Sequence, residues 1–68
     1  MAELVKVVVD AMGGDLAPVE PVKAAVEAVK ERKDILVILT GQEKVIHSEL
    51  KKYQDYPTDR IQVVNATE

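Results

Sequence analysis

The stretch VKVVVDAMGGD, residues 5–15, joins a strand, a glycine turn and the approach to a helix. The run from Leu4 to Val9 is nearly continuous in apolar, mostly β-branched residues, so it predicts a buried strand. Asp10 follows, and Gly13-Gly14 allows the backbone to adopt positive φ and to approach a bound molecule closely. Residues 17–21 predict the start of a helix, whose free N–H groups and positive dipole end face the loop. This arrangement is typical of an α/β protein that binds a ligand at a strand's carboxyl end.

Downstream of the loop, the apolar residues alternate between helical and strand periodicity. The predicted segments are a helix with an inner stripe of Val19, Val22, Ala25, Val26 and Val29, a strand at Ile35–Leu39, a second helix at Glu43–Tyr53, a turn-rich connection at 54–59, and a short strand at Ile61–Val64. Strands that alternate with helices predict an α/β fold with a parallel sheet and right-handed crossovers. The sequence therefore predicts a βαβαβ unit.

Two helices are too few to cover the apolar surface of the three predicted strands. If the strands add in one direction, both helices lie on one face, and half of Ile35–Leu39 is left bare. If the chain doubles back, each face receives one helix. A chain of 68 residues also buries only about 60% of its unfolded surface, and it has no cysteine for a disulfide. We therefore predict that residues 1–68 are the N-terminal part of a single larger α/β domain, or that the chain needs a partner.

Composition and charge exclude several classes of function. The formal net charge is −3, the basic residues are scattered, and Tyr53 and Tyr56 are the only aromatic residues, so nucleic-acid binding is not expected. A single histidine, His47, and no cysteine argue against a zinc site, and no metal or cofactor is predicted. No apolar run has the length of a membrane span. The apolar stretch near the N-terminus is too short, and its surroundings are too acidic, for a secretory signal. The expected location is cytoplasmic.

Three strand tips should share one edge of the sheet, because parallel strands all end on the same side. They are residues 10–15, 40–43 and 65–68, and they contain carboxylates but no lysine or arginine. The carboxylates are Asp10, Asp15, Glu43 and Glu68. An anion at this edge would therefore need backbone N–H groups, or basic side chains from outside this chain.

The candidate binding residues at this edge are Asp10, Gly13, Gly14 and Asp15, and no catalytic residue can be assigned. Each has a structural alternative: the glycines can simply make the turn, Asp15 can cap the helix or the turn before it, and Asp10 can accept hydrogen bonds from loop amides. Met12 is interpreted as a packing residue. Neither the G-x-G-x-x-G dinucleotide pattern nor the phosphate-loop pattern with Gly-Lys-Ser/Thr is present.

The string Val8-Val9-Asp10-Ala11-Met12-Gly13-Gly14-Asp15, followed by Ala17-Pro18, resembles the N-terminal signature of the bacterial phosphate acyltransferases of phospholipid synthesis, the PlsX family. Residues 38–41 and 60–68 follow the same family order, so the resemblance covers the whole chain. Three positions depart from the family pattern: Leu16 and Asn65 stand where histidine is common, and Gln42 stands where aspartate is common. These departures argue against an imidazole acid or base at these positions.

The resemblance implies an enzyme several times longer than this chain, with a Rossmann-like α/β/α sandwich related to phosphotransacetylases. It implies transfer of a fatty acyl group from acyl carrier protein to inorganic phosphate, giving acyl phosphate for phospholipid synthesis. It also implies a homodimer that is peripheral at the inner face of the membrane through parts outside this chain. Residues 1–68 alone are then expected to be inactive. In this interpretation the Gly13 and Gly14 amides position phosphate or the oxyanion, while Asp10 and Asp15 shape the loop.

A second hypothesis is a non-catalytic nucleotide- or phosphate-binding Rossmann-like module that completes its sheet by association. Titration with acyl carrier protein, phosphate and nucleotides distinguishes the two. A receiver-type phosphoacceptor domain is disfavoured, because the tip of its third strand requires an aspartate where this chain has Asn65.

Overall fold

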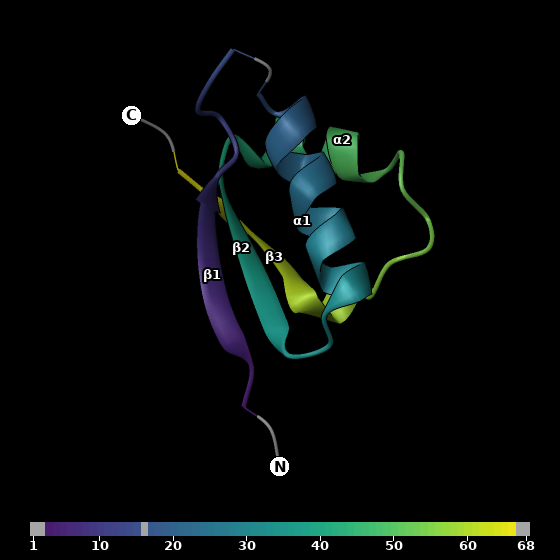
Figure 1. The fold of residues 1–68 in the computed structure, drawn as a ribbon. Coiled ribbons are helices and arrows are strands. Elements are labelled where there is room, and N and C mark those ends of the chain that lie inside the picture. The colour runs from purple at the N-terminus through teal and green to yellow at the C-terminus, as the bar shows by residue number, and fades with distance from the viewer. Residues whose placement is uncertain (1–2, 16, 67–68) are drawn as a thin grey trace.

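The computed structural model describes residues 3–15 and 17–66. Its elements are β1 (Val5–Asp10), α1 (Val19–Glu31), β2 (Ile35–Gly41), α2 (Glu43–Leu50), the 3₁₀ turn η1 (Thr58–Arg60) and β3 (Ile61–Asn65). This order confirms the predicted βαβαβ unit of an α/β fold (Figure 1). The expectations for Leu16 and Glu68 lie outside the described residues.

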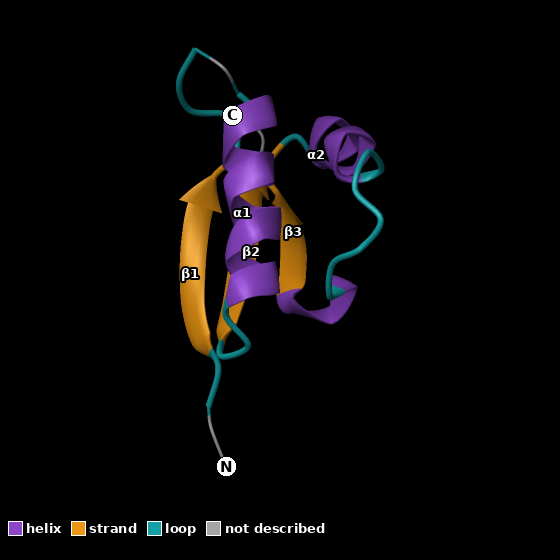
Figure 2. Ribbon diagram, turned by 45° about the vertical axis from the view of Figure 1, so that its right-hand side comes forward, coloured by secondary structure: helices purple, strands orange, loops and turns teal. Residues whose placement is uncertain are grey.

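The three strands form one parallel sheet in the order β1-β2-β3. Because successive right-handed crossovers move in one direction, both helices lie on the same face of the sheet (Figure 2). Of the two predicted arrangements, the structure therefore has the one in which the strands add in one direction. Within the described residues, no helix covers the opposite face.

The hydrophobic core lies between β2 and the two helices. Leu39 of the central strand, Val22 and Val29 of α1, and Ile46 of α2 are all fully buried. The predicted inner stripe of α1 is confirmed, with the exception of Val19, which is 46% exposed because it begins the helix next to the exposed loop. The core thus holds the two βα units together.

The prediction of a buried strand at residues 4–9 is wrong for the described chain. Val5 is 53% exposed, Val7 39% and Val8 67%. The reason is that β1 is an outer strand, and α1 packs chiefly on β2 (Figure 2). Leu36, on the central strand β2, is by contrast only 7% exposed.

The second helix is shorter than its apolar pattern predicts. It ends at Leu50, followed by Lys51 at the C-cap, and the Tyr53 N–H then donates to the Leu50 carbonyl at 3.0 Å. Tyr53 is half-buried and packs against the core from outside the helix. The apolar spacing therefore predicts correctly that Tyr53 packs against the core, but it does not predict that its backbone lies outside the helix.

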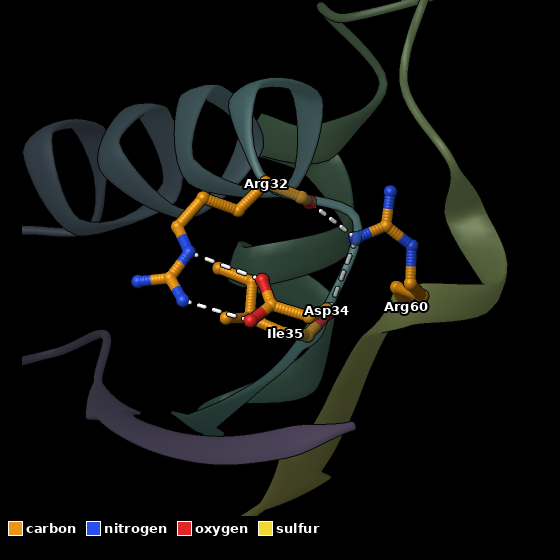
Figure 3. A network of polar contacts seen from close by, with 4 residues as sticks. All are labelled: Arg32, Asp34, Ile35 and Arg60. Carbon is orange, nitrogen blue, oxygen red and sulfur yellow. Dashed lines mark hydrogen bonds and ion pairs between the residues drawn. The ribbon is translucent and has the colours of Figure 1, made fainter. Parts of the chain in front are cut away.

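A network of polar contacts joins the end of α1 to the starts of β2 and β3 (Figure 3). Arg60 Nη1 donates to the Arg32 carbonyl at 2.6 Å and to the Ile35 carbonyl at 3.2 Å, and its Nη2 donates to the Val29 carbonyl at 2.8 Å. A separate exposed pair joins Arg32 Nη2 to Asp34 Oδ2 at 2.8 Å. One guanidinium therefore binds three backbone carbonyls from two elements that precede it by about thirty residues.

The Arg32–Asp34 pair gives a pH-dependent prediction. Hydrogen bonding to the Arg32 guanidinium lowers the pKa of Asp34 below its ordinary value. A carboxylate with a depressed pKa stabilises the fold above its unfolded pKa of about 3.9, and this contribution is lost as the pH falls through the folded value. NMR titration of the Asp34 carboxyl should show the depressed pKa, and Arg32→Ala should return it toward the ordinary value. An unchanged Asp34 pKa in Arg32→Ala would contradict this assignment.

No helix in residues 3–15 and 17–66 combines the length and the apolar character needed to cross a bilayer.

Candidate functional site at the carboxyl edge of the sheet

The three strand tips lie side by side at one edge, as the sequence predicts. The register pairs Asp10 with Thr40 and Gly41 with Asn65. Backbone hydrogen bonds extend the pairing past the strands: the Ala11 N–H donates to the Thr40 carbonyl, and the Ala66 N–H donates to the Gly41 carbonyl, both at 2.8 Å. The loop of residues 10–15 is therefore attached to the next strand tip at Ala11.

Asp10 shapes the glycine loop. Its Oδ1 accepts a hydrogen bond from the Met12 N–H at 3.0 Å, and its carbonyl accepts a long one from the Gly13 N–H at 3.4 Å. A Cβ at Gly13 would lie 3.3 Å from Asp10 Oδ2. The Asp10 carboxylate thus closes a tight turn, and Gly13 leaves it the space to do so.

Gly14 is required for its backbone conformation. Its φ is +91°, a region that L side chains rarely adopt, whereas a Cβ at this position would meet nothing within 4 Å. The backbone at Gly14 therefore borders open space, and a substitution there acts through φ rather than through a steric clash.

The loop and the first turn of α1 line an open hollow of about 460 Å³. Its lining residues are Gly13, Gly14, Asp15, Ala17, Glu20 and Pro21. Asp15 does not cap α1, because the helix begins after Pro18 and has no side-chain cap. Pro21 has no N–H to offer, so within this first turn the backbone donors are those of Val19 and Glu20. Glu20, a second carboxylate beside Asp15, is a lining residue that sequence reasoning missed.

Met12 and Gly41 connect the first two strand tips. Gly41 has φ +147°, and a Cβ there would collide with Met12 Cγ and lie 3.3 Å from Ile46 Cδ1. The Met12 side chain therefore packs closely over the Gly41 backbone, which supports its interpretation as a packing residue. Gly41 makes the turn and also leaves the space that Met12 fills.

Asn65 connects the third tip to α2. Its Oδ1 accepts a hydrogen bond from the N–H of Glu43, the first residue of the helix, at 3.3 Å. The N-cap residue Gln42 makes no capping hydrogen bond with its own side chain. The amide of Asn65 thus satisfies a helix N-terminus across the sheet, a role that the local sequence does not reveal.

Lys44 is the basic residue that sequence reasoning missed at this edge. It lines a second hollow of about 260 Å³ together with Gln42, Glu43 and Asn65. The signal was available, because Lys44 directly follows the predicted tip at residues 40–43. In the described chain, one lysine therefore borders an edge that also carries the exposed carboxylates of Asp10, Asp15, Glu20 and Glu43.

Two further features separate this edge from other kinds of site. Among the described residues, no three His, Cys, Asp or Glu side chains gather in a way that could hold a metal ion. A larger hollow of about 490 Å³ lies beside α2 and β3, lined among others by His47, Tyr53 and Val63, and it includes no residue of the glycine loop.

A parallel sheet with a glycine turn, a helix start and two further strand tips at one edge defines an α/β protein with the arrangement in which open α/β sheets place their ligand sites. The chain belongs to the fatty acid synthesis protein family, whose family model matches residues 5–68.

Proteins named phosphate acyltransferase are similar to this chain. The chain is 51% identical to the one from Fusobacterium nucleatum and 56% identical to the one from Alkaliphilus oremlandii, each over 63 residues, or 93% of the chain. The match to the Halothermothrix orenii protein is 46% identical over the same length. The chain spans only 18–19% of the length of these relatives.

Gly41→Ala tests the contact with Met12. The protein to use is residues 1–68 joined to the remainder of the Alkaliphilus oremlandii relative, referred to as the completed protein. We expect Gly41→Ala to lower its free energy of unfolding by about 2–4 kcal/mol, because the new methyl collides with Met12 and φ is unfavourable. Gly14→Ala is the control: it shares the positive φ without the collision, and should cost about 1–2 kcal/mol. Urea denaturation measures both, and equal losses would contradict the Met12 contact.

Proposed function

We propose that residues 1–68 are the N-terminal segment of a phosphate acyltransferase that moves a fatty acyl group from acyl carrier protein to inorganic phosphate. The observation that carries the proposal is the 46–56% identity to proteins named phosphate acyltransferase, over 63 residues. The glycine loop at the carboxyl edge supports it, because such loops bring backbone N–H groups close to anions.

The proposed reaction needs positioning more than side-chain chemistry. A phosphate oxygen attacks the thioester carbonyl carbon, the C–S bond breaks, and the thiolate of the carrier leaves and takes up a proton. The products are acyl phosphate and free carrier thiol. Catalysis then rests on holding phosphate against the thioester and on stabilising the oxyanion of the tetrahedral intermediate.

Gly14 is the stronger of the two glycine candidates for contacting phosphate. The Gly13 N–H is directed at the Asp10 carbonyl, at 3.4 Å, so it closes the turn. Gly14 has the positive φ and the open surroundings that let a ligand approach its backbone. In this proposal Asp10 shapes the loop, and Asp15 lines the hollow beside it.

The charge of the edge indicates that this segment does not act alone. Four exposed carboxylates, those of Asp10, Asp15, Glu20 and Glu43, disfavour a phosphate dianion, and Lys44 supplies one positive charge against them. The remaining basic groups would come from the rest of the enzyme. The proposal includes a homodimer in the cytoplasm that is peripheral to the inner membrane face through those other parts.

The test is the phosphate-dependent release of carrier thiol from acyl-acyl carrier protein by the completed protein. We expect release that saturates with phosphate, and no release by residues 1–68 alone. Calorimetric titration with phosphate and with nucleotides runs in parallel. Nucleotide binding without thiol release would favour the non-catalytic module and overturn the acyltransferase proposal.

A further inference from the structure

The outer face of α2 carries a row of basic side chains. Lys44 and Lys51 lie seven residues apart, so they share one face of the helix, about 10 Å from each other along its axis. Lys51 still has helical dihedral angles, with φ −62° and ψ −17°. Ser48 lies between the two lysines and His47 lies beside them, and all four residues are exposed. We call these four residues the basic face of α2.

The carboxylates of α2 lie off the basic face. Glu49 is only 8% exposed, and its Oε1 forms an ion pair with Lys52 Nζ at 3.1 Å. Glu43 is exposed at the start of the helix, but it precedes Lys44 by one residue and is turned from it by about 100°. Among residues 3–15 and 17–66, neither Lys44 nor Lys51 forms an ion pair. In a chain of net charge −3, this face is therefore a local excess of positive charge.

An apolar hollow borders the basic face. It is the hollow of about 490 Å³ beside α2 and β3, and both His47 and Lys51 belong to its lining. The rest of the lining includes apolar and aromatic side chains of the core or packed against it: Leu50, Tyr53, Tyr56, Ile61 and Val63. A row of cations beside an apolar hollow fits an amphipathic helix, whose acidic residues meet the lysines while an apolar side chain enters the hollow.

The basic face begins at the carboxyl edge of the sheet. Lys44 lines the second hollow of that edge together with Asn65, at the tip of β3. α2 as a whole lies on the β3 side of the helical layer (Figure 2). A partner that lies along α2 therefore reaches the edge at which the proposed reaction takes place.

We propose that the basic face of α2 and the adjoining hollow dock an acidic helix of a partner protein, and that this partner is the acyl carrier protein. The choice of partner rests on the proposed function, because the acyl group must reach the carboxyl edge on its carrier. The acidic character of the docked helix follows from the lysines, since charges of opposite sign steer two proteins together and fix their orientation. Such docking acts on recognition of the carrier rather than on the bonds that form and break.

Charge reversal at the end of each helix tests the docking surface in the completed protein. Lys51→Glu reverses a charge on the basic face. Lys30→Glu is the matched control, because Lys30 is likewise an exposed lysine at the end of a helix, α1. We expect Lys51→Glu to raise KM for acyl-acyl carrier protein roughly 5- to 10-fold with kcat and KM for phosphate nearly unchanged, and Lys30→Glu to change each less than about 2-fold. With an acyl-pantetheine thioester, which lacks the protein, both variants should react like the unsubstituted protein.

Equal changes of KM for the carrier in the two variants would overturn the proposal. Slower reaction of acyl-pantetheine in Lys51→Glu would overturn it as well, because the substitution would then disturb the fold or the chemistry. Two other occupants give different results. If KM for the carrier is unchanged while Lys51→Glu weakens binding to phosphatidylglycerol vesicles, a membrane takes this face. If instead Lys51→Glu changes the molar mass in light scattering, a second copy takes it, and either result contradicts the proposal.

Direct binding of acyl carrier protein, measured by fluorescence anisotropy, separates this proposal from the proposed function. Carrier binding that Lys51→Glu weakens, without any thiol release by the unsubstituted completed protein, supports the docking surface and contradicts the acyltransferase. Thiol release and carrier binding that are both insensitive to Lys51→Glu support the acyltransferase and overturn the docking surface.

Discussion

Replacing Gly14 by valine in the completed protein is expected to lower kcat/KM for phosphate roughly 100-fold, because the backbone that we propose to position the anion can no longer keep its conformation. Gly14 has φ +91°, and a β-branched residue is strongly disfavoured there. Since nothing lies within 4 Å of a Cβ at this position, the fold should survive the change. Steady-state kinetics with varied phosphate, together with a thermal melt, measure the two effects.

Gly14→Asn is the matched variant, because asparagine tolerates positive φ better than other residues with a side chain. If the backbone conformation is what matters, Gly14→Asn should keep much more activity than Gly14→Val. Equal losses in the two variants would mean that the volume of the side chain, rather than φ, disturbs the site. If Gly14→Val has the same kinetics as the unsubstituted protein, Gly14 does not belong to the phosphate site.

The second large effect is expected at Arg60. Arg60→Ala should lower the free energy of unfolding of the completed protein by about 2–4 kcal/mol, because it leaves three backbone carbonyls without their charged donor. These carbonyls belong to Val29, Arg32 and Ile35, at distances of 2.6–3.2 Å. Figure 3 shows the contacts with Arg32 and Ile35. The positive charge also lies near the C-terminus of α1, where the helix dipole favours cations. Urea denaturation measures the loss.

Two variants separate the geometry of Arg60 from its charge. Arg60→Lys keeps the charge but loses the planar fork, so it should recover only part of the stability. Arg32→Ala removes a guanidinium whose partner is the exposed Asp34, and it should change stability little. A loss in Arg32→Ala as large as that in Arg60→Ala would contradict the assignment of the network to Arg60.

The alternation of elements and the location of the glycine loop could be predicted from sequence, because both depend on local patterns. β-Branched runs, helical spacing and the Gly13-Gly14 turn each lie within a few residues. The shared edge followed from the direction of parallel strands. The end of α2 could not be predicted from the sequence. Tyr53 lies at the next position of the helical apolar pattern, but it packs against the core from outside the helix.

The contacts that build the site could not be predicted, because they join distant positions. Met12 packs over Gly41, and Asn65 caps a helix that begins 22 residues earlier. Nothing near either residue in the sequence marks these partners. The exposure of β1 has a different cause: in the described sheet β1 is an outer strand with a neighbouring strand on one side, which the apolar pattern of its own residues does not reveal.

The Arg60 contacts have a consequence for synthesis on the ribosome. The three carbonyls lie at the end of α1 and the start of β2, but their donor is added about 25–31 residues later. While the nascent chain grows, water must satisfy these groups, so we expect the junction between α1 and β2 to remain loose until Arg60 has left the exit tunnel. It becomes fixed when residue 60 emerges, immediately before β3 joins the sheet. The first βαβ unit should therefore mature as a step coupled to the arrival of the third strand.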